Sequence, residues 1–525
     1  MKHAIIITAI LLFSFKALPQ TFSYELLDAQ KVEGTEQLIS IKDGFLHFET
    51  GLNRRPLATP DATVNKFPDF HKITVNKLDN QLKQVASKSL FGGKKIVRWL
   101  YNPIKLNDKV YVIYHDLDRE NDGAVKLARI DEQTLEAVDE MTLFDFSKNK
   151  VSIDYKKIIK KEYATFSFRL SEDEKNLMIT IDPQVEYDDP KIVFVSIFDG
   201  NLKPVLEKRV DFKAAQNKVS VQSIICDNSG NAYIAYGDYT NKKVATGLLD
   251  NDKTLLILQP GNKPNIKLNL DIKDYSMTDV NLVYTPQQNK VYAMGPFNIG
   301  WGENLVGVYQ AYIDLKTMQL STPVNTKFPE ELVSKVAEDG YAKTKDKNYG
   351  LLRNFFNYCV VRGDGSVDMI MRYTEAVPIQ GKGLLYAADF YGGDFIDVHL
   401  LNGKTQFTRI GRNMKIGQDL RNYLWSATFV KDDKLILIYN DNEKNINRPV
   451  DETAKAGAIA SSELCASIID SKGNVTRQQM MEGNNDNTVA YLDHLYSIDK
   501  NTFLVMIDRF TILKIKNKYA KFSVK

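Results

Sequence analysis

Cysteine is scarce in this chain of 525 residues, which has only Cys226, Cys359 and Cys465. An odd count with wide spacing does not indicate a disulfide framework. We therefore expect buried free thiols, with one disulfide and a leftover thiol as the alternative. No Cys-x-x-Cys occurs, so a zinc or redox site built on paired cysteines is not indicated.

Familiar catalytic motifs are also missing. The sequence has no Gly-x-Ser-x-Gly, no His-Glu-x-x-His and no phosphate-binding loop. Gly300 and Gly302 fall in an expected hairpin loop rather than at a strand-to-helix turn, so they are not a dinucleotide fingerprint. Arg362-Gly363-Asp364 spells an adhesion tripeptide but lies where a tight turn is expected. The sequence therefore contains no motif that indicates a particular reaction.

An excess of charge of one sign is absent too, with Lys+Arg 69 against Asp+Glu 66. This balance gives no electrostatic case for nucleic acid as a partner. The one long apolar run, from Ala4 to Phe15, is too short to span a bilayer. We expect residues 1–20 to be a secretory signal peptide, and residues 21–525 to reach the periplasm, cell surface or medium with no transmembrane segment.

What the chain does have is a repeat. Tyr 26 and Phe 26 against Trp 3 favour strands. Eight times an apolar strand meets a tight polar turn and then an alternating strand, as at Leu38–Leu46 and Cys226–Ile234. A second turn follows each, after pairs such as Leu78-Asp79. We place it at Leu249-Asp250 in the fourth unit and, in degenerate form, at Lys516-Asn517 in the eighth.

Two hairpins per unit predict four antiparallel strands, and about 60 residues per unit suit propeller blades. We predict an all-β fold, a single β-propeller of about eight four-stranded antiparallel blades over residues 21–525, with seven blades as the alternative. Residues 221–258 look like one undecorated unit. Units one and eight each look complete, so no strand exchange is expected. A short helix is predicted over 329–340, with Pro329 at its start and Gly340 at its end.

The loops predict where function lies. With strands A to D counted outwards from the channel, the A–B and C–D turns are short, whereas most B–C connections are long. The long ones are residues 51–70, 116–124, 183–190, 295–306, 374–394 and 440–461, with units four and eight kept tight. Several long loops on one face favour a binding surface, the alternative being neutral variation of surface loops.

Polar and aromatic residues in these loops are the candidate ligand-binding residues. They are Tyr187, Asp188, Phe297, Asn298, Trp301, Tyr386, Tyr391, Asp394, Asn440, Asp441, Asn442 and Asn445. Amides, carboxylates and rings of this kind suit saccharide hydroxyls or a protein surface. Alternatively, the amides form Asx turns and the rings pack the loops against the blades.

An acidic loop in the second unit offers the one candidate metal site. Asp118, Glu120 and Asp122, followed by Gly123, partly match a calcium loop, but Arg129 stands where the last carboxylate ligand belongs. A solvated acidic loop is the alternative. Apart from possible Ca²⁺, no cofactor is expected.

As a whole, the repeats resemble those of β-propellers in general, without the motifs of any named repeat family. The chain is similar to secreted propeller-like proteins of Gram-negative bacteria, whose leaders often end in Ala-x-Gln; here Ala17-Leu18-Pro19-Gln20 stands at that point. This resemblance transfers no catalytic residue. The leading hypothesis is a non-catalytic binding or scaffold protein with a protein or saccharide partner in the envelope. The alternative is a hydrolase or lyase acting on saccharide or peptide, with carboxylates such as Asp188, Asp189, Asp394 and Asp441 at the channel mouth.

Overall fold

The computed structural model describes most of the chain. The described residues are 22–27, 37–50, 73–91, 97–100, 103–117, 123–149, 151, 164–183, 189–238, 252–270, 275–299, 304–344, 349–378, 388–401, 403–417, 423–450, 452–458, 462–481, 488–510 and 515–525. The expected leader lies outside them. Within them, no helix is long and apolar enough to cross a membrane.

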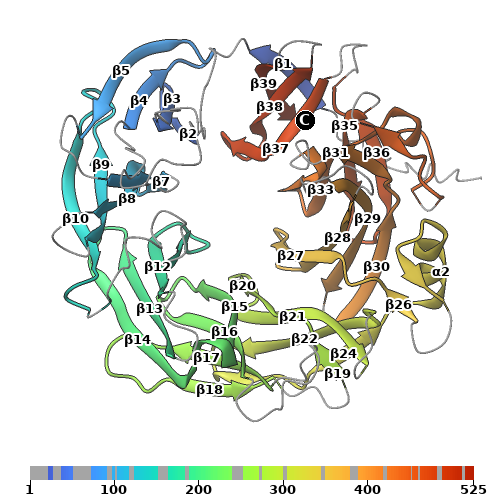
Figure 1. The fold of residues 1–525 in the computed structure, drawn as a ribbon, viewed down its shortest axis with the longest axis horizontal. Helices are drawn as coiled ribbons and strands as arrows, with labels where there is room; N and C mark the ends of the chain where they lie inside the picture. Colours follow the sequence, from blue (N-terminus) through green and yellow to red (C-terminus); the bar gives the residue numbers. More distant parts are fainter. Residues whose placement is uncertain are drawn as a thin grey trace, which may run out of the picture.

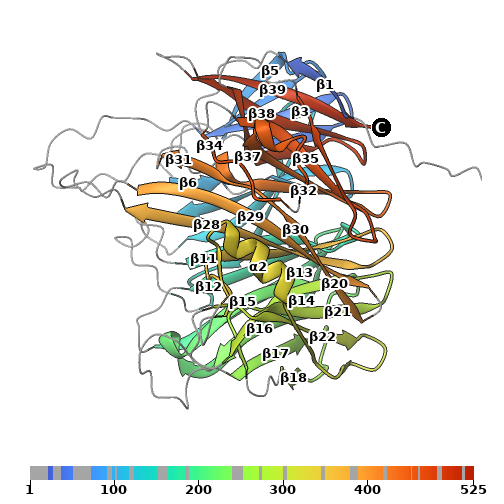
Figure 2. The same cartoon turned by 90° about the vertical axis from the view of Figure 1, so that its right-hand side faces the viewer.

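Eight antiparallel sheets stand in a ring around a central opening (Figure 1). Each supplies one blade, and the sheets follow one another in chain order around the ring. The side view shows the blades as strongly twisted strands running between two faces (Figure 2). The predicted all-β propeller of eight blades is confirmed, and the alternative of seven blades is wrong.

The first four blades take up the chain from Gln37 to Asn269. Blade one consists of β2 (Gln37–Ile41), β3 (Gly44–Thr50), β4 (Ile73–Leu78) and β5 (Gln84–Leu90), and blade two of β6 (Val97–Leu100), β7 (Ile104–Leu106), β8 (Lys109–Leu117), β9 (Ala124–Ile130) and β10 (Ala137–Asp145). Blade three consists of β11 (Ala164–Leu170), β12 (Asn176–Pro183), β13 (Pro190–Asp199) and β14 (Pro204–Ala215). Blade four consists of β15 (Val219–Cys226), β16 (Ala232–Asp238), β17 (Asp252–Leu258) and β18 (Ile266–Asn269). A 3₁₀ turn, η1 (Gln216–Lys218), joins blades three and four.

The last four blades are larger and carry the additions. Blade five consists of β19 (Tyr275–Met277), β20 (Asn281–Thr285), β21 (Lys290–Ile299), β22 (Gly307–Asp314), β23 (Gln319–Leu320) and β24 (Val324–Lys327). Blade six consists of β27 (Phe355–Val361), β28 (Val367–Pro378), β29 (Ala388–Leu401), β30 (Lys404–Ile410) and β31 (Met414–Gly417), with β34 (Gly457–Ala458) pairing parallel to β31. Blade seven consists of β32 (Ser426–Lys431), β33 (Lys434–Asn442), β35 (Ser462–Ile469) and β36 (Val475–Gln479), and blade eight of β37 (Thr488–Ser497), β38 (Thr502–Phe510), β39 (Ile515–Val524) and β1 (Phe22–Leu27).

The ring closes by a strand exchange that the sequence analysis did not expect. Strand β1, from the N-terminal part, pairs antiparallel with β39 and is the outermost strand of blade eight. Lys516-Asn517 lies inside β39, so it is not the second turn of that blade. The expectation of two complete terminal units was wrong because the pairing of residues 500 positions apart leaves no local trace in the sequence.

The fourth blade also corrects the sequence analysis. Its C–D turn follows β17 at residues 259–265, rather than at Leu249-Asp250, and the blade spans 219–269 rather than 221–258. The B–C connection of this blade, residues 239–251, is therefore long and not tight. Leu249 and Asp250 themselves lie outside the described residues. The apolar residue followed by Asp resembled the turn signal of other units without being one.

Elsewhere the predicted turn residues do what their chemistry suggests. In the C–D turn of blade three, the Asp199 carboxylate accepts hydrogen bonds from the backbone N–H groups of Asn201 and Lys203, both at 2.9 Å. Asp79 and Asp470 do the same in blades one and seven. A carboxylate at the start of the turn thus holds the chain reversal together with the backbone hydrogen bonds of the turn.

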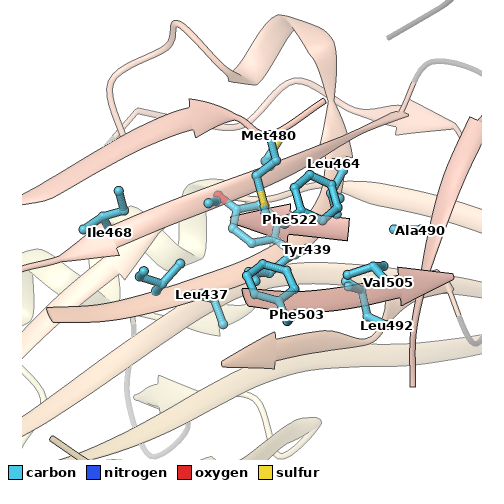
Figure 3. Packing of buried hydrophobic residues seen from close by; sticks show 14 of the residues in the cluster. Leu437, Tyr439, Leu464, Ile468, Met480, Ala490, Leu492, Phe503, Val505 and Phe522 are labelled. Carbon is cyan, nitrogen blue, oxygen red and sulfur yellow. The ribbon is translucent and has the colours of Figure 1, made fainter. Parts of the chain in front are cut away.

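Apolar side chains fill the seams between blades. Separate clusters join blades one and two, two and three, three and four, four and five, and five and six. One large cluster spans blades six to eight (Figure 3), and another joins blade eight to blade one through Phe45 and Leu504. The core is therefore a closed ring, which fits alternating strands whose two faces each meet a neighbouring blade.

Helix α2 (Glu330–Glu338) lies on the outside of the ring beside blades five and six (Figures 1 and 2). It falls within the range predicted for it, with Pro329 as its N-cap residue. Leu332, Val333 and Val336 are buried in the seam of blades five and six. The short ladder of β25 (Ala342–Lys343) and β26 (Gly350–Leu351) follows it.

Candidate functional site

The B–C and D–A connections lie on one face, which we call the long-loop face; the A–B and C–D turns form the short-turn face. Several candidates on the long-loop face lie outside the described residues, and for them the assignments stay predictions. These are Tyr187, Asp188, Trp301 and Tyr386, together with the candidate calcium ligands Asp118, Glu120 and Asp122. Among the described residues, no three or more His, Cys, Asp or Glu residues are grouped so that they could hold a metal ion.

Four candidates at and just after the end of β33 are buried: Asn440 joins this strand to its neighbours, and Asp441, Asn442 and Asn445 hold the long B–C loop of blade seven. The Asn440 amide donates to the carbonyls of Tyr423 at 3.0 Å and Ala490 at 2.7 Å. The Asn442 side chain accepts from the Lys444 N–H, capping the 3₁₀ turn η4 (Glu443–Asn445). The interpretation of these amides as loop-forming residues is the one that the hydrogen bonds support.

Asn445 fastens the far side of the same loop. Its side-chain amide group donates to the backbone carbonyl of Lys455 and to Oδ1 of Asp441, both at 3.0 Å. Its side-chain oxygen, Oδ1, accepts from the Lys455 N–H at 2.7 Å. Arg477 donates to the backbone carbonyl of Asn445 and, at 2.8 Å, to that of Gly411. Buried polar groups that are satisfied in this way rigidify a structure. These hydrogen bonds fasten the described part of the loop to blades six and seven.

Asp394 is fully buried in β29, where it also holds neighbouring segments together. Its carboxylate accepts from Arg409 Nε at 2.6 Å and from the Arg412 backbone N–H at 3.1 Å. Arg409 also pairs with Asp339 just after α2. Burial raises the pKa of Asp394 to about 7, against the opposing pull of Arg409. The carboxylate thus ties the helix to the sheet and is enclosed by protein.

Arg412 lies at the centre of this network. It donates to the carbonyls of Asn440 and Leu424, both at 3.0 Å, and its guanidinium carbon lies 5.2 Å from the ring centre of Phe395. Its Nη2, and Oδ2 of Asp441, have no hydrogen-bond partner among the described residues. Burial lowers the pKa of Arg412 to about 10, with Asp441 opposing. Burial likewise raises the pKa of Asp441, with Arg477 opposing.

The remaining described candidates do not join this network. Phe297 is fully buried in the seam of blades four and five, where it closely approaches Gly307. Asn298 is 2% exposed. Tyr391 is half-buried on β29 and lies 5.4 Å from Lys415 Nζ. The structure therefore favours a packing role for Phe297, and among the described candidates it brings together Asp394, Asn440, Asp441, Asn442 and Asn445.

An aromatic site that the sequence analysis missed lies at the channel end of these blades. Phe356, the second residue of β27, is 61% exposed and is the direct cross-strand partner of Arg372. Trp425, just before β32, is 41% exposed, and the Arg372 guanidinium carbon lies 4.4 Å from its ring centre. We call these three residues the blade 6–7 rim. They lie on the long-loop face, because inner strands begin there.

Two cavities lie at the other end of the channel. One of about 880 Å³ is lined by inner strands and turns of blades one, two, three, seven and eight, and includes Lys431 and Asp499. The second, of about 310 Å³, is lined by blades three to six and includes Arg169 and Glu172. Neither lining includes Asp394 or Asp441. Both lie toward the short-turn face, where the inner strands end.

A second buried charge cluster lies between blades six and seven, near the short-turn face. Arg362 donates from Nε to Asp368 Oδ2 at 2.6 Å and from Nη2 to Asp368 Oδ1 at 2.9 Å, while His399 Nδ1 lies 2.8 Å from Oδ1. Burial raises the pKa of Asp397, and repulsion from the carboxylate of Asp368 raises it further. Arg362 is 1% exposed, so the Arg-Gly-Asp tripeptide does not present its arginine to a partner.

Comparison with known proteins adds little to this description. No family model matches the chain, and no curated protein matches it. Among solved structures, it is similar to a protein of unknown function from Dyadobacter fermentans, with 10% identity and a TM-score of 0.29 over 69% of this chain and 96% of that one. It is also similar to a Synechocystis apocarotenoid oxygenase mutant, with 9% identity and a TM-score of 0.33 over 94% and 93% of the two chains.

A prolyl endopeptidase is a further similar structure, with 9% identity and a TM-score of 0.37 over 80% of this chain and 46% of that one. Likeness at these levels carries no argument about activity. The sheets themselves define the class: the chain is an eight-bladed β-propeller protein.

Proposed function

We propose that the protein is an exported, non-catalytic binding or scaffold protein that engages a protein or saccharide partner of the cell envelope on its long-loop face. The observation that carries the proposal is the buried cluster of Asp441, Asn442 and Asn445, whose hydrogen bonds hold the B–C loop of blade seven. A loop that varies without function does not need three buried polar residues to hold it, since each unsatisfied one would cost about 1–3 kcal/mol.

The extended hairpin of blade six supports the same view. Strands β28 and β29 pair as far as Pro378 and Ala388, and β31 adds to the end of β29. The inner side of this arm packs through Phe390 and Met414 on Leu424, in a small apolar cluster separate from the main core. Blades six and seven thus present a built surface beside the exposed rings of the rim.

The alternative of an envelope hydrolase or lyase rests on carboxylates at the channel mouth. Of the four candidates, Asp394 and Asp441 are fully buried and already accept hydrogen bonds from protein groups. A carboxylate enclosed in this way is poorly placed to protonate or attack a substrate. Asp188 lies outside the described residues and Asp189 is exposed, so this enclosure applies to Asp394 and Asp441 alone.

Shortening the loops tests the proposal. Residues 376–390 and 446–456 are each replaced by a short turn, and capture of envelope components by the purified protein is quantified. We expect capture to fall at least tenfold. The matched control shortens residues 259–265 on the short-turn face and should leave capture unchanged. Equal capture by the long-loop variants, with their fold intact by circular dichroism, would contradict the proposal.

A further inference from the structure

The geometry of the blade 6–7 rim points to a saccharide as its ligand: we propose that Phe356 and Trp425 stack on a sugar ring while Arg372 and its neighbours bind hydroxyl or carboxylate groups. This inference rests on the proposed function and narrows it to one class of partner. It concerns residues outside the network of blade seven, and none of the three was found from the sequence.

The rings are presented in a way that suits stacking. One side of the Trp425 indole is covered by the Arg372 guanidinium at 4.4 Å, and 41% of the residue remains exposed. Arg372 as a whole residue is only 8% exposed, and its guanidinium packs against one face of the indole. Phe356 lies directly across the β27–β28 pair from Arg372. Two exposed rings therefore flank one fixed cation.

Polar groups follow the rings along the same seam. Tyr358 is two residues after Phe356 on β27 and so points to the same side, and its hydroxyl lies 3.5 Å from the Ser426 hydroxyl. A pyranose has an apolar C–H face and an edge of hydroxyl groups. Rings next to a guanidinium and hydroxyls match both parts of that surface.

The size of the patch favours a sugar over a folded protein. The exposed large apolar residues among those described are Tyr24, Leu26, Val85, Val324, Phe356, Val377 and Trp425. Phe356 and Trp425 both adjoin Arg372, and Tyr24 and Leu26 form a separate pair on β1, the outermost strand of blade eight. Half-exposed rings offer roughly 200 Å² together. A stable protein interface buries about 800 Å² per partner, whereas a single sugar ring is covered by two aromatic side chains.

The test compares the double variant Phe356→Ala/Trp425→Ala with the wild type and with Val85→Ala, which removes an apolar side chain that is 59% exposed on an outer strand. Each is assayed on a glycan array spanning neutral, amino and acidic sugars, and on envelope extract treated with protease or with periodate. We expect binding that resists protease, is lost with periodate, falls at least tenfold in the double variant and is unchanged in Val85→Ala.

The outcomes separate the two proposals. Capture that depends on the rim but is lost with protease and survives periodate would overturn the saccharide and leave the proposed function standing. Capture unaffected by the rim substitutions would overturn the site. No binding to any array glycan, with capture from the extract retained, would also overturn the saccharide. The conservative variant Phe356→Tyr/Trp425→Phe should keep most of the affinity, which distinguishes lost stacking from a lost fold.

Discussion

Lys253 shows at the scale of one residue how the ring tolerates buried charge. It lies near the start of β17, is 2% exposed, and its Nζ has no hydrogen-bond partner among the described residues. Burial lowers its pKa to about 8, with Asp279 opposing. Below pH 8 the folded protein must hold an ammonium ion in a site that disfavours it, which costs stability.

Replacing Lys253 by Met should therefore stabilise the protein at pH 7, by up to about 3 kcal/mol if the whole pKa shift is recovered. Because the unfolded chain binds more protons between pH 8 and 10.5, the wild type gains stability as the pH rises through that window, and the advantage of Met shrinks. Urea unfolding at pH 7 and pH 10 measures both values. A variant that is less stable than the wild type at pH 7 would contradict this account of the buried ammonium.

Neighbouring residues on one strand also show what a sequence cannot settle. Phe355 is 4% exposed and packs toward blade five, whereas Phe356 is 61% exposed at the rim. The alternation of a strand predicts that the two point to opposite sides, but not which side is covered. That depends on the distance between blades at the channel mouth, which is set by the whole ring. The aromatic residues of the rim therefore could not be identified from the sequence alone.

At the scale of single elements, the B–C loop of blade seven is held by side chains rather than by strand pairing. Asn445 makes three hydrogen bonds across the loop, two of them to Lys455. The polar residues after Leu435–Tyr439 were identified from the sequence, with ligand binding and loop formation both left open. In the structure these residues are buried and hydrogen-bonded, which supports loop formation, and ligand binding stays a prediction. The burial comes from packing under the loop, which no local pattern encodes.

Asn445→Ala should loosen this loop without unfolding the blade. Loss of the three hydrogen bonds should raise amide hydrogen exchange across residues 446–458 by an order of magnitude or more, because local opening no longer has to break them. Exchange in β33 and β35 should change little. Asn474→Ala is the matched control: it removes an exposed asparagine from the C–D turn of the same blade. Equal exchange in both variants would contradict the proposed role.

At the scale of the whole molecule, the eight-fold repeat could be predicted because each turn carries its own chemistry, as Asp79 and Asp199 show. Closure could not be predicted in this way. Strand β1 pairs with β39 from the opposite end of the chain, and its sequence, Phe22–Leu27, differs little from that of other strands. The N-terminal strand therefore links the two ends of the chain through blade eight.

A disulfide across this contact tests the closure. Ser23 and Ser523 are partners in the β1–β39 pair, whereas Cys226 and Cys465 are buried and Cys359 is half-buried on β27, so Ser23→Cys/Ser523→Cys should form one new bond. Cross-linking so distant a pair should stabilise the oxidised protein by a few kcal/mol, because it restricts the unfolded chain. The midpoint of urea unfolding should rise and return on reduction. Ser23→Cys alone is the control, and failure to cross-link would contradict the pairing.

The central claim is that the long-loop face of blades six and seven is the binding surface. Hydrogen exchange of the full chain, alone and with the captured envelope ligand at saturation, tests it most directly. The account predicts slower exchange at residues 354–357, 371–378, 423–426 and 440–458. Protection confined to 429–432 and 495–501, around the larger cavity at the short-turn end of the channel, would contradict it.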